Sequence, residues 1–235
     1  MAEPGTTAAD GAGTARDGPS PTRRGPETRD AIEGAAIELF ARLGYHATSM
    51  RAVASAAGVQ PAAIYHWYPS KEAILVHLQD DFMERLTDKV IAAIGMHHRP
   101  ALRLAAAVRE HVVFHGIHRR EAFVTDSEIR ALTEGPRRAL IAQRDSYQAI
   151  FSEIIRDGIR DGSLRSSDAH VATYAILLQC TGVALWFDPS GPLTLEQVAE
   201  LHVELVLGSL GASRELIAEA IESVSRNPVG AAGRG

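Results

Sequence analysis

The side chains with the clearest chemistry lie in the stretch 48–71, which reads TSMRAVASAAGVQPAAIYHWYPSK. Gln60 can hydrogen-bond a base edge, and the small side chains of Ala62 and Ala63 let a helix backbone approach the bases. Tyrosine and lysine side chains can bind phosphate oxygens and so set the register on a duplex. The side chains that we expect to contact DNA are Thr48, Ser49, Arg51, Gln60, Pro61, Ala62, Ala63, Tyr65, His66, Tyr68 and Lys71.

Two short helices joined by a tight turn would position these side chains. The hydroxyl of Thr48 or Ser49 can cap the first helix, and apolar residues recur at helical spacing over 50–57. Gly58 follows where a left-handed residue ends a helix, and Pro61 is tolerated in the first turn of the next one. The pattern predicts a helix-turn-helix, whose second helix enters the major groove of DNA. An ordinary helical hairpin with an aromatic plug is the alternative.

The charge pattern around this stretch is uneven. No Asp or Glu occurs over 44–71, although the whole chain has a formal net charge of −5. Over 27–75, however, the sequence contains four cationic and five anionic side chains, so the region is not basic overall. To bind DNA, a protein of this kind would depend on a few specific contacts and on dimerisation rather than on a broad basic surface.

The region 32–75 resembles the DNA-binding domain of the TetR family of repressors. The matching segments occur in the family's order and spacing: AAIELF at 35–40, GY at 44–45, TSMR at 48–51, AGV at 57–59, IY at 64–65 and KEAIL at 71–75. The triplet HWY at 66–68 departs from the family's more usual His-Tyr-Phe-like triplet but keeps its aromatic character. The resemblance implies a repressor that binds a palindromic operator in double-stranded DNA as a homodimer.

The remainder of the chain predicts an all-α protein, because no strand-like alternation occurs and helical periodicity recurs throughout. We expect a disordered tail at 1–26, a three-helix DNA-binding domain at 27–75, an α-helical ligand-binding and dimerisation domain at 76–225, and a flexible tail at 226–235. One long helix from Ser70 to Ile94 would link the two domains. Arg23 and Arg24 could reach a minor groove, although a solubilising tail is the simpler interpretation.

Composition places the chain in the cytoplasm. It has 235 residues, 46% of them apolar, and a single cysteine, Cys180, so no internal disulfide can form. The first thirty residues lack the apolar stretch of a signal peptide. The longest apolar run, 175–187, is too short to span a bilayer, so we expect no membrane partner.

Two expected helices, 168–187 and 194–210, are apolar around most of their circumference. Such helices must be buried on both sides, which predicts core on one side and a second copy of the chain on the other. The resemblance implies the same arrangement, because TetR regulators typically dimerise through their last two large helices. A central helix pair without a partner is the alternative.

A looser resemblance links the second half of the chain to the acyl-CoA-responsive repressors of fatty-acid and steroid catabolism. It rests on SEIRAL at 127–132, RD at 144–145, Gly158, Gly162 and WFDP at 186–189. It implies a small hydrophobic effector in a mostly apolar cavity with few polar anchors; a drug-like or antibiotic-type effector is the alternative. The expected cavity walls are Phe114, Phe123, Tyr147, Phe151, Trp186 and Phe187. The arginines that could meet CoA phosphates, or instead be solvated, are Arg130, Arg137, Arg138 and Arg144.

Metal binding and enzymatic catalysis are the two other classes of chemistry to consider. His111, His115 and His118 share one helix face, which could make a metal-sensing repressor, but HVVFH lacks the Glu of a metalloprotease motif. The chain has no Gly-x-Ser-x-Gly elbow and no phosphate-cradling Gly-rich loop. We therefore expect a regulator that is not an enzyme and uses no cofactor and no metal.

Overall fold

A computed structural model describes residues 25–226, and all of its regular elements are helical. The expected all-α fold is confirmed. The elements are α1 Gly25–Leu43, α2 Met50–Ala56, α3 Pro61–Trp67, α4 Lys71–Ile94, α5 Pro100–Ile117, α6 Arg119–Ser127, the short 3₁₀ helix η1 Glu128–Ala131, α7 Glu134–Arg160, α8 Ala169–Thr181, α9 Val183–Trp186, α10 Leu195–Ser209 and α11 Arg214–Arg226.

Local sequence signals set several of these helix boundaries. Ser49 caps α2 by accepting from the Ala52 N–H at 3.1 Å, and Ser70 caps α4 in the same way. Gly58, between α2 and α3, has φ +68°, a conformation that a residue with a Cβ adopts at a cost. Thr194 and Gln197 form a reciprocal capping box at the start of α10.

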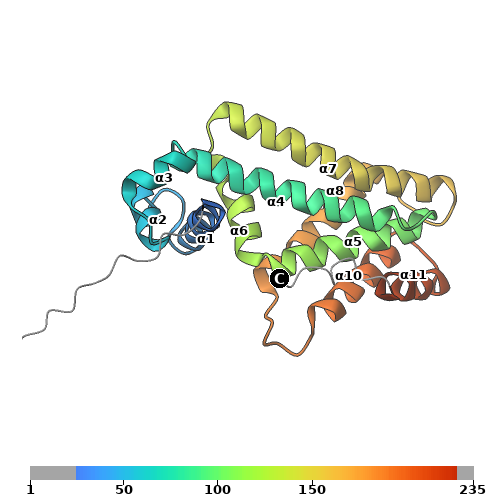
Figure 1. Ribbon diagram of the computed structural model, residues 1–235. Helices are drawn as coiled ribbons and strands as arrows, with labels where there is room; N and C mark the ends of the chain where they lie inside the picture. The colour runs from blue at the N-terminus through green and yellow to red at the C-terminus, as the bar shows by residue number, and fades with distance from the viewer. Residues whose placement is uncertain (1–24, 227–235) are drawn as a thin grey trace, which may run out of the picture.

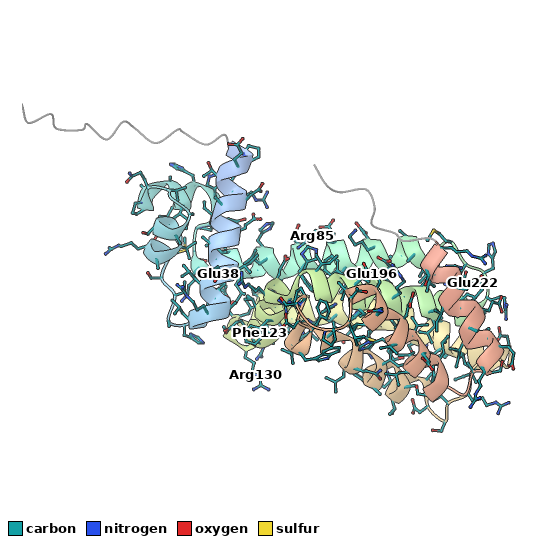
Figure 2. The ribbon with its side chains drawn as sticks, turned by 90° about the horizontal axis from the view of Figure 1, so that it is seen from below. Glu38, Arg85, Phe123, Arg130, Glu196 and Glu222 are labelled. Carbon is teal, nitrogen blue, oxygen red and sulfur yellow. The ribbon has the colours of Figure 1, made fainter. Side chains whose placement is uncertain are left out.

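The helices form a small head and a larger body (Figure 1). Helices α1, α2 and α3 gather at one end, and α4 leaves them and runs along the body beside α5 and α7. Helix α5 is the centre of the body, because α4, α7, α8, α10 and α11 all pack against it. Gly116 permits the close approach of α5 to the start of α10, because a Cβ at this position would lie 2.2 Å from a methyl carbon of Leu195. In Figure 2, α1 lies across the end of this body.

The expected extents of the tails, of the helix 168–187 and of the first domain differ from the structure. Gly25 and Pro26 belong to α1 rather than to the predicted tail, and Arg226 is the last residue of α11. The expected helix 168–187 is interrupted at Gly182, which divides it into α8 and α9. Arg23, Arg24 and most of both predicted tails lie outside the described residues. The predicted domain boundary after residue 75 falls inside α4, which continues without a break.

The segment Ala169–Trp186 is long and apolar enough, by length and composition, to cross a membrane, and 22% of it is buried in the body. The core helix of a soluble protein can pass the same test.

Candidate functional site

Helix α3, the second helix of the helix-turn-helix, presents a continuous exposed face. Ile64 is fully buried and fixes α3 against the head, whereas Gln60, Pro61 and Ala62 are exposed at its start and Tyr65 is 56% exposed. Ser49, Arg51 and His66 are also exposed, and Ala63 is half-buried. Small side chains followed by an aromatic one therefore form the surface that a major groove would meet.

Two of the expected DNA-contacting side chains point inward instead. Thr48 is 2% exposed, and its hydroxyl donates to the carbonyl oxygen of Gly44 at 2.9 Å. Tyr68 is 5% exposed, and its hydroxyl donates to Glu33. Burial raises the pKa of the Tyr68 phenol, so it remains protonated. The expectation that these two side chains contact DNA was wrong, since both serve the packing of the head.

Lys71 is also engaged within the protein. Its ammonium donates to the carbonyl oxygens of Tyr45 and Thr48, each at 2.6 Å, and lies 4.2 Å from the centre of the Tyr45 ring. Desolvation lowers the pKa of Lys71, while Glu128 opposes the shift. The side chain joins the start of α4 to the turn between α1 and α2, which gives it a positioning role within the protein, and its contact with phosphate stays a prediction.

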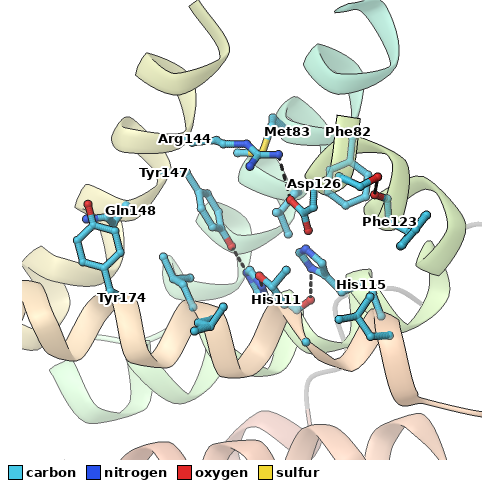
Figure 3. A pocket seen from close by; sticks show the side chains of 18 residues that line it. Phe82, Met83, His111, His115, Phe123, Asp126, Arg144, Tyr147, Gln148 and Tyr174 are labelled. Atoms are coloured by element: carbon cyan, nitrogen blue, oxygen red, sulfur yellow. Dashed lines mark hydrogen bonds and ion pairs between the residues drawn. The ribbon is translucent and has the colours of Figure 1, made fainter. Parts of the chain in front are cut away.

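The body contains a cavity of about 570 Å³. Helices α4 to α9 all contribute to its wall, which is mostly apolar. Its lining residues are Phe82, Met83, Leu86, His111, His115, Phe123, Asp126, Ser127, Arg144, Tyr147, Gln148, Tyr174, Leu177, Leu178, Thr181, Gly182, Ala184 and Leu185. Figure 3 shows the labelled side chains converging on it from different helices.

Of the six aromatic residues expected to form its wall, Phe123 and Tyr147 line the cavity. Phe114 and Phe151 are buried in the core between helices. The phenylalanine and tryptophan pattern could not distinguish core from cavity, because both demand apolar side chains at helical spacing.

The aromatic pair at the end of α9 does not line the cavity either. Trp186 is 56% exposed, and its ring stacks at 6.2 Å on that of His202. Phe187 is buried, and its carbonyl accepts from Arg119. The expectation that Phe114, Phe151, Trp186 and Phe187 form the cavity wall was therefore wrong.

Two histidines form the polar floor of the cavity. The His111 and His115 rings are buried and stacked, with centroids 4.1 Å apart. His111 contacts the Tyr147 hydroxyl through Nδ1 at 2.7 Å and the Thr181 hydroxyl through Nε2 at 3.0 Å. Nδ1 of His115 lies 2.9 Å from the carbonyl oxygen of His111.

Burial also determines the protonation of this floor. It lowers the pKa of His115 to about 4 and that of His111 well below its ordinary value. Burial raises the pKa of the Tyr147 phenol. At neutral pH the floor therefore consists of two neutral imidazoles and a protonated phenol.

One cationic side chain lines the cavity. Arg144 donates through Nη2 to the Thr125 carbonyl at 2.9 Å and to Asp126 at 3.0 Å, while its buried Nε has no partner among the described residues. Figure 3 shows the Arg144–Asp126 pair above the two histidines. The other expected arginines, Arg130, Arg137 and Arg138, are exposed outside the lining.

The three histidines considered for a metal do not converge. His111 and His115 are stacked and hydrogen-bonded as described, and His118 instead pairs with Glu121 at 3.4 Å. Over 25–226, no three His, Cys, Asp or Glu side chains are grouped as metal ligands.

Helix α6 connects the cavity to the head, a link that sequence patterns did not reveal. It contributes Phe123, Asp126 and Ser127 to the cavity wall and packs against α1. Arg120 on α6 pairs with Glu38 on α1 at 2.9 Å; Figure 2 labels Glu38.

Two further contacts join the segment after α6 to the head and to the first turn of α4. A carboxylate oxygen of Glu128 accepts from the Tyr45 N–H at 3.2 Å, and Glu72 accepts from the Thr133 N–H at 2.6 Å. A shift of the cavity wall would therefore reach the turn before α2 directly.

The outer surface of α8, α9 and α10 is apolar. Its most exposed large side chains are Val171, Tyr174, Leu178, Leu185, Trp186, Leu201 and Leu205. Leu178 is 78% exposed, and Tyr174, Leu178 and Leu185 also line the cavity. An exposed apolar surface of this kind is typical of a site that binds a protein, a membrane or a ligand, and three of its side chains belong to the cavity wall as well.

Sequence comparisons match known families in both parts of the chain. Residues 32–78 match the family described as bacterial regulatory proteins of the tetR family, and residues 97–210 match the tetracyclin repressor-like C-terminal domain. The chain is 29% identical over 190 residues to the HTH-type transcriptional repressor KstR2 of Mycolicibacterium smegmatis, covering 79% of this chain and 92% of that protein.

Solved structures of regulatory proteins are similar to this chain over most of its length. A tetR-family regulatory protein from Rhodococcus RHA1 superposes with a TM-score of 0.75 at 28% identity, covering 79% of this chain and 98% of that one. AibR in complex with isovaleryl coenzyme A and operator DNA superposes with a TM-score of 0.70 at 26% identity, covering 76% and 97%.

Proposed function

We propose a function for this chain from the premise that it belongs to the TetR family of bacterial regulatory proteins. Regulators of this family bind operator DNA, dimerise and respond to small molecules, and they are not enzymes. The function is that of a cytoplasmic dimeric repressor of transcription. It leaves its palindromic operator when an acyl-CoA thioester of a lipid or steroid metabolite enters the cavity.

The observation that carries the effector class is a large apolar cavity with a guanidinium group in its wall. An acyl chain or a carbocycle would occupy the apolar volume. Arg144, whose Nε lacks a partner, can bind an anionic or carbonyl oxygen at the wall. The exposed Arg130, Arg137 and Arg138 would meet phosphates outside the cavity. The likeness to AibR, whose structure holds isovaleryl coenzyme A, supports this class of effector.

Derepression would proceed through α6 and α4. Both helices line the cavity, and both contact the head, α6 through Arg120 and the adjoining Glu128, and α4 through its own first turn. An effector shifts the equilibrium only if it binds the two conformations with different affinity. Coupling of about 1–3 kcal/mol is typical for such a device.

Dimerisation would use the apolar surface of α8, α9 and α10. Leu205, 59% exposed and outside the cavity lining, is the position of choice for a test. Leu205→Glu is expected to convert a sedimenting dimer into a monomer, because each interface would then bury two unpaired carboxylates. The matched Ile117→Glu, on a side chain that is 64% exposed on α5, should leave the dimer intact. A dimer that survives Leu205→Glu would contradict this interface.

The effector experiment needs an operator, which the wild-type chain can select from a pool of random duplexes. Release of the selected duplex is then measured with isovaleryl-CoA, octanoyl-CoA and 3-hydroxyoctanoyl-CoA, and with free CoA and the free acids as controls. We expect at least one thioester to release DNA and free CoA to be inactive. In Leu177→Trp, which fills the cavity, DNA binding should persist and release should be lost. Release by none of the thioesters would exclude this effector class.

A further inference from the structure

The floor of the cavity leaves one hydrogen-bond acceptor without a partner. The carbonyl oxygen of His111 can only accept, so Nδ1 of His115, 2.9 Å away, must carry the proton. In a neutral imidazole the other nitrogen, Nε2, then holds a lone pair. Nothing within the described part of the chain donates to it, and the ring lines the cavity (Figure 3).

A donor lies beside this acceptor. Tyr147, neutral His111 and Thr181 form a chain of two hydrogen bonds and carry one O–H, one N–H and one O–H between them. Two of the three protons fill the two bonds, whichever tautomer His111 adopts. The third remains on the hydroxyl of Tyr147 or of Thr181, and both side chains line the cavity. The floor thus offers one free acceptor and one free donor.

We infer that the effector carries a hydroxyl group on its apolar body, which donates a hydrogen bond to Nε2 of His115. The spare proton of Tyr147 or Thr181 is donated to an oxygen of the same ligand. A ketone, an ester or an unsubstituted acyl chain can satisfy only the donor, and it leaves Nε2 of His115 unpaired once it covers that nitrogen, which is costly. This inference rests on the proposed function in one respect, that the cavity is the effector site.

The experiment uses menthol and menthone, an alcohol and a ketone that share one apolar carbon skeleton. The full chain is labelled with ¹⁵N in its histidine rings, and long-range ¹H–¹⁵N correlations report the tautomers. His115→Phe identifies the His115 signals. His202 is the internal reference, because its Nδ1 makes the same contact, 2.7 Å from the Val198 carbonyl, and it does not line the cavity.

We expect His115 and His202 to be protonated at Nδ1. Menthol should shift the Nε2 resonance of His115 but not that of His202, and it should bind about tenfold more tightly than menthone, the effect of one buried hydrogen bond. In His115→Phe this preference should disappear. A His115 ring protonated at Nε2, a menthol affinity no greater than that of menthone, or no binding of menthol would overturn the inference.

The outcome is separable from the test of the proposed function. Thioesters that fail to release operator DNA, combined with a preference for menthol, would remove the acyl-CoA assignment and keep the hydroxyl requirement. Release by a thioester without a preference for menthol would do the reverse.

Discussion

The head and the cavity differ in how far apart along the sequence their functional side chains lie. The DNA-facing surface comes from one segment, 49–66, whose two helices are oriented by Ile64 and by a single glycine turn. The cavity draws side chains from six helices between Phe82 and Leu185. A local surface tolerates changes elsewhere in the chain, whereas a cavity assembled from many helices responds to changes in any of them. This difference suits a family that keeps one way of binding DNA and varies its effector.

The largest effect should come from a charge on the exposed face of α3. Ala62→Glu adds a carboxylate where the helix would approach phosphates and base edges, and in a dimer the change occurs twice. We expect operator affinity to fall about a thousandfold, measured by fluorescence anisotropy on the selected duplex. Ala142→Glu, an exposed position on α7, makes the same change in net charge and should have little effect. Equal losses in the two variants would show that charge alone, and not the α3 face, is responsible.

Acid should act on the cavity through its buried histidines. The folded pKa of His115 is about 4 and its ordinary value 6.5, so the unfolded chain binds more protons between these values. Stability is therefore complete above pH 6.5 and falls as the pH is lowered toward 4, by roughly 3 kcal/mol for this group at most. Urea unfolding at neutral and acid pH measures the loss. His115→Phe should flatten this dependence, and an unchanged slope in the variant would argue against a neutral, buried His115.

Lys71 tests whether a cation in the head binds phosphate or positions the fold. Lys71→Met removes the donor of the Thr48 carbonyl and one of the two donors of the Tyr45 carbonyl, so we expect the chain to lose about 1–3 kcal/mol of stability. The slope of log affinity for the operator against log salt should not change, because no phosphate contact is lost. Arg51→Met, at an exposed position, should reduce that slope by about one and leave stability unchanged. The reverse assignment of the two effects would restore Lys71 as a phosphate contact.

The same contrast explains what the sequence could predict. Capping hydroxyls, Gly58 and the apolar period identify the head because each signal acts within a few residues. Tyr68 and Thr48 escaped this logic, since their burial depends on Glu33 in α1 and on the chain before α2. The exposed apolar surface of α8–α10 was detectable as excess hydrophobicity.

The cavity wall was not predictable in this way. Phe151 and Tyr147 lie on the same helix and have similar side chains, yet only Tyr147 reaches the cavity, because packing against other helices decides which ring faces an empty volume. His111 and His115 stand out for their spacing, but the two hydrogen-bond partners of His111 come from α7 and α8. No pattern within one helix can encode such a contact.

The smallest expected effect concerns the link between the two regions. Glu128 follows the α6 wall of the cavity and accepts a hydrogen bond from the Tyr45 N–H at the edge of the head. Glu128→Ala removes that contact without touching the cavity lining or the exposed face of α3. Operator affinity without effector and effector affinity without DNA should each change less than about twofold. The effector-induced loss of operator affinity should shrink about fivefold, which corresponds to roughly 1 kcal/mol of coupling.

Arg130→Ala, in the same 3₁₀ helix, is the control. The contacts that it removes are with the effector's phosphates or with solvent, so the effector-induced loss of operator affinity at saturating effector should be normal. Full coupling in Glu128→Ala would show that the Glu128–Tyr45 hydrogen bond does not carry the coupling. The Arg120–Glu38 and Glu72–Thr133 contacts, which reach α1 and the first turn of α4, would then be the next candidates.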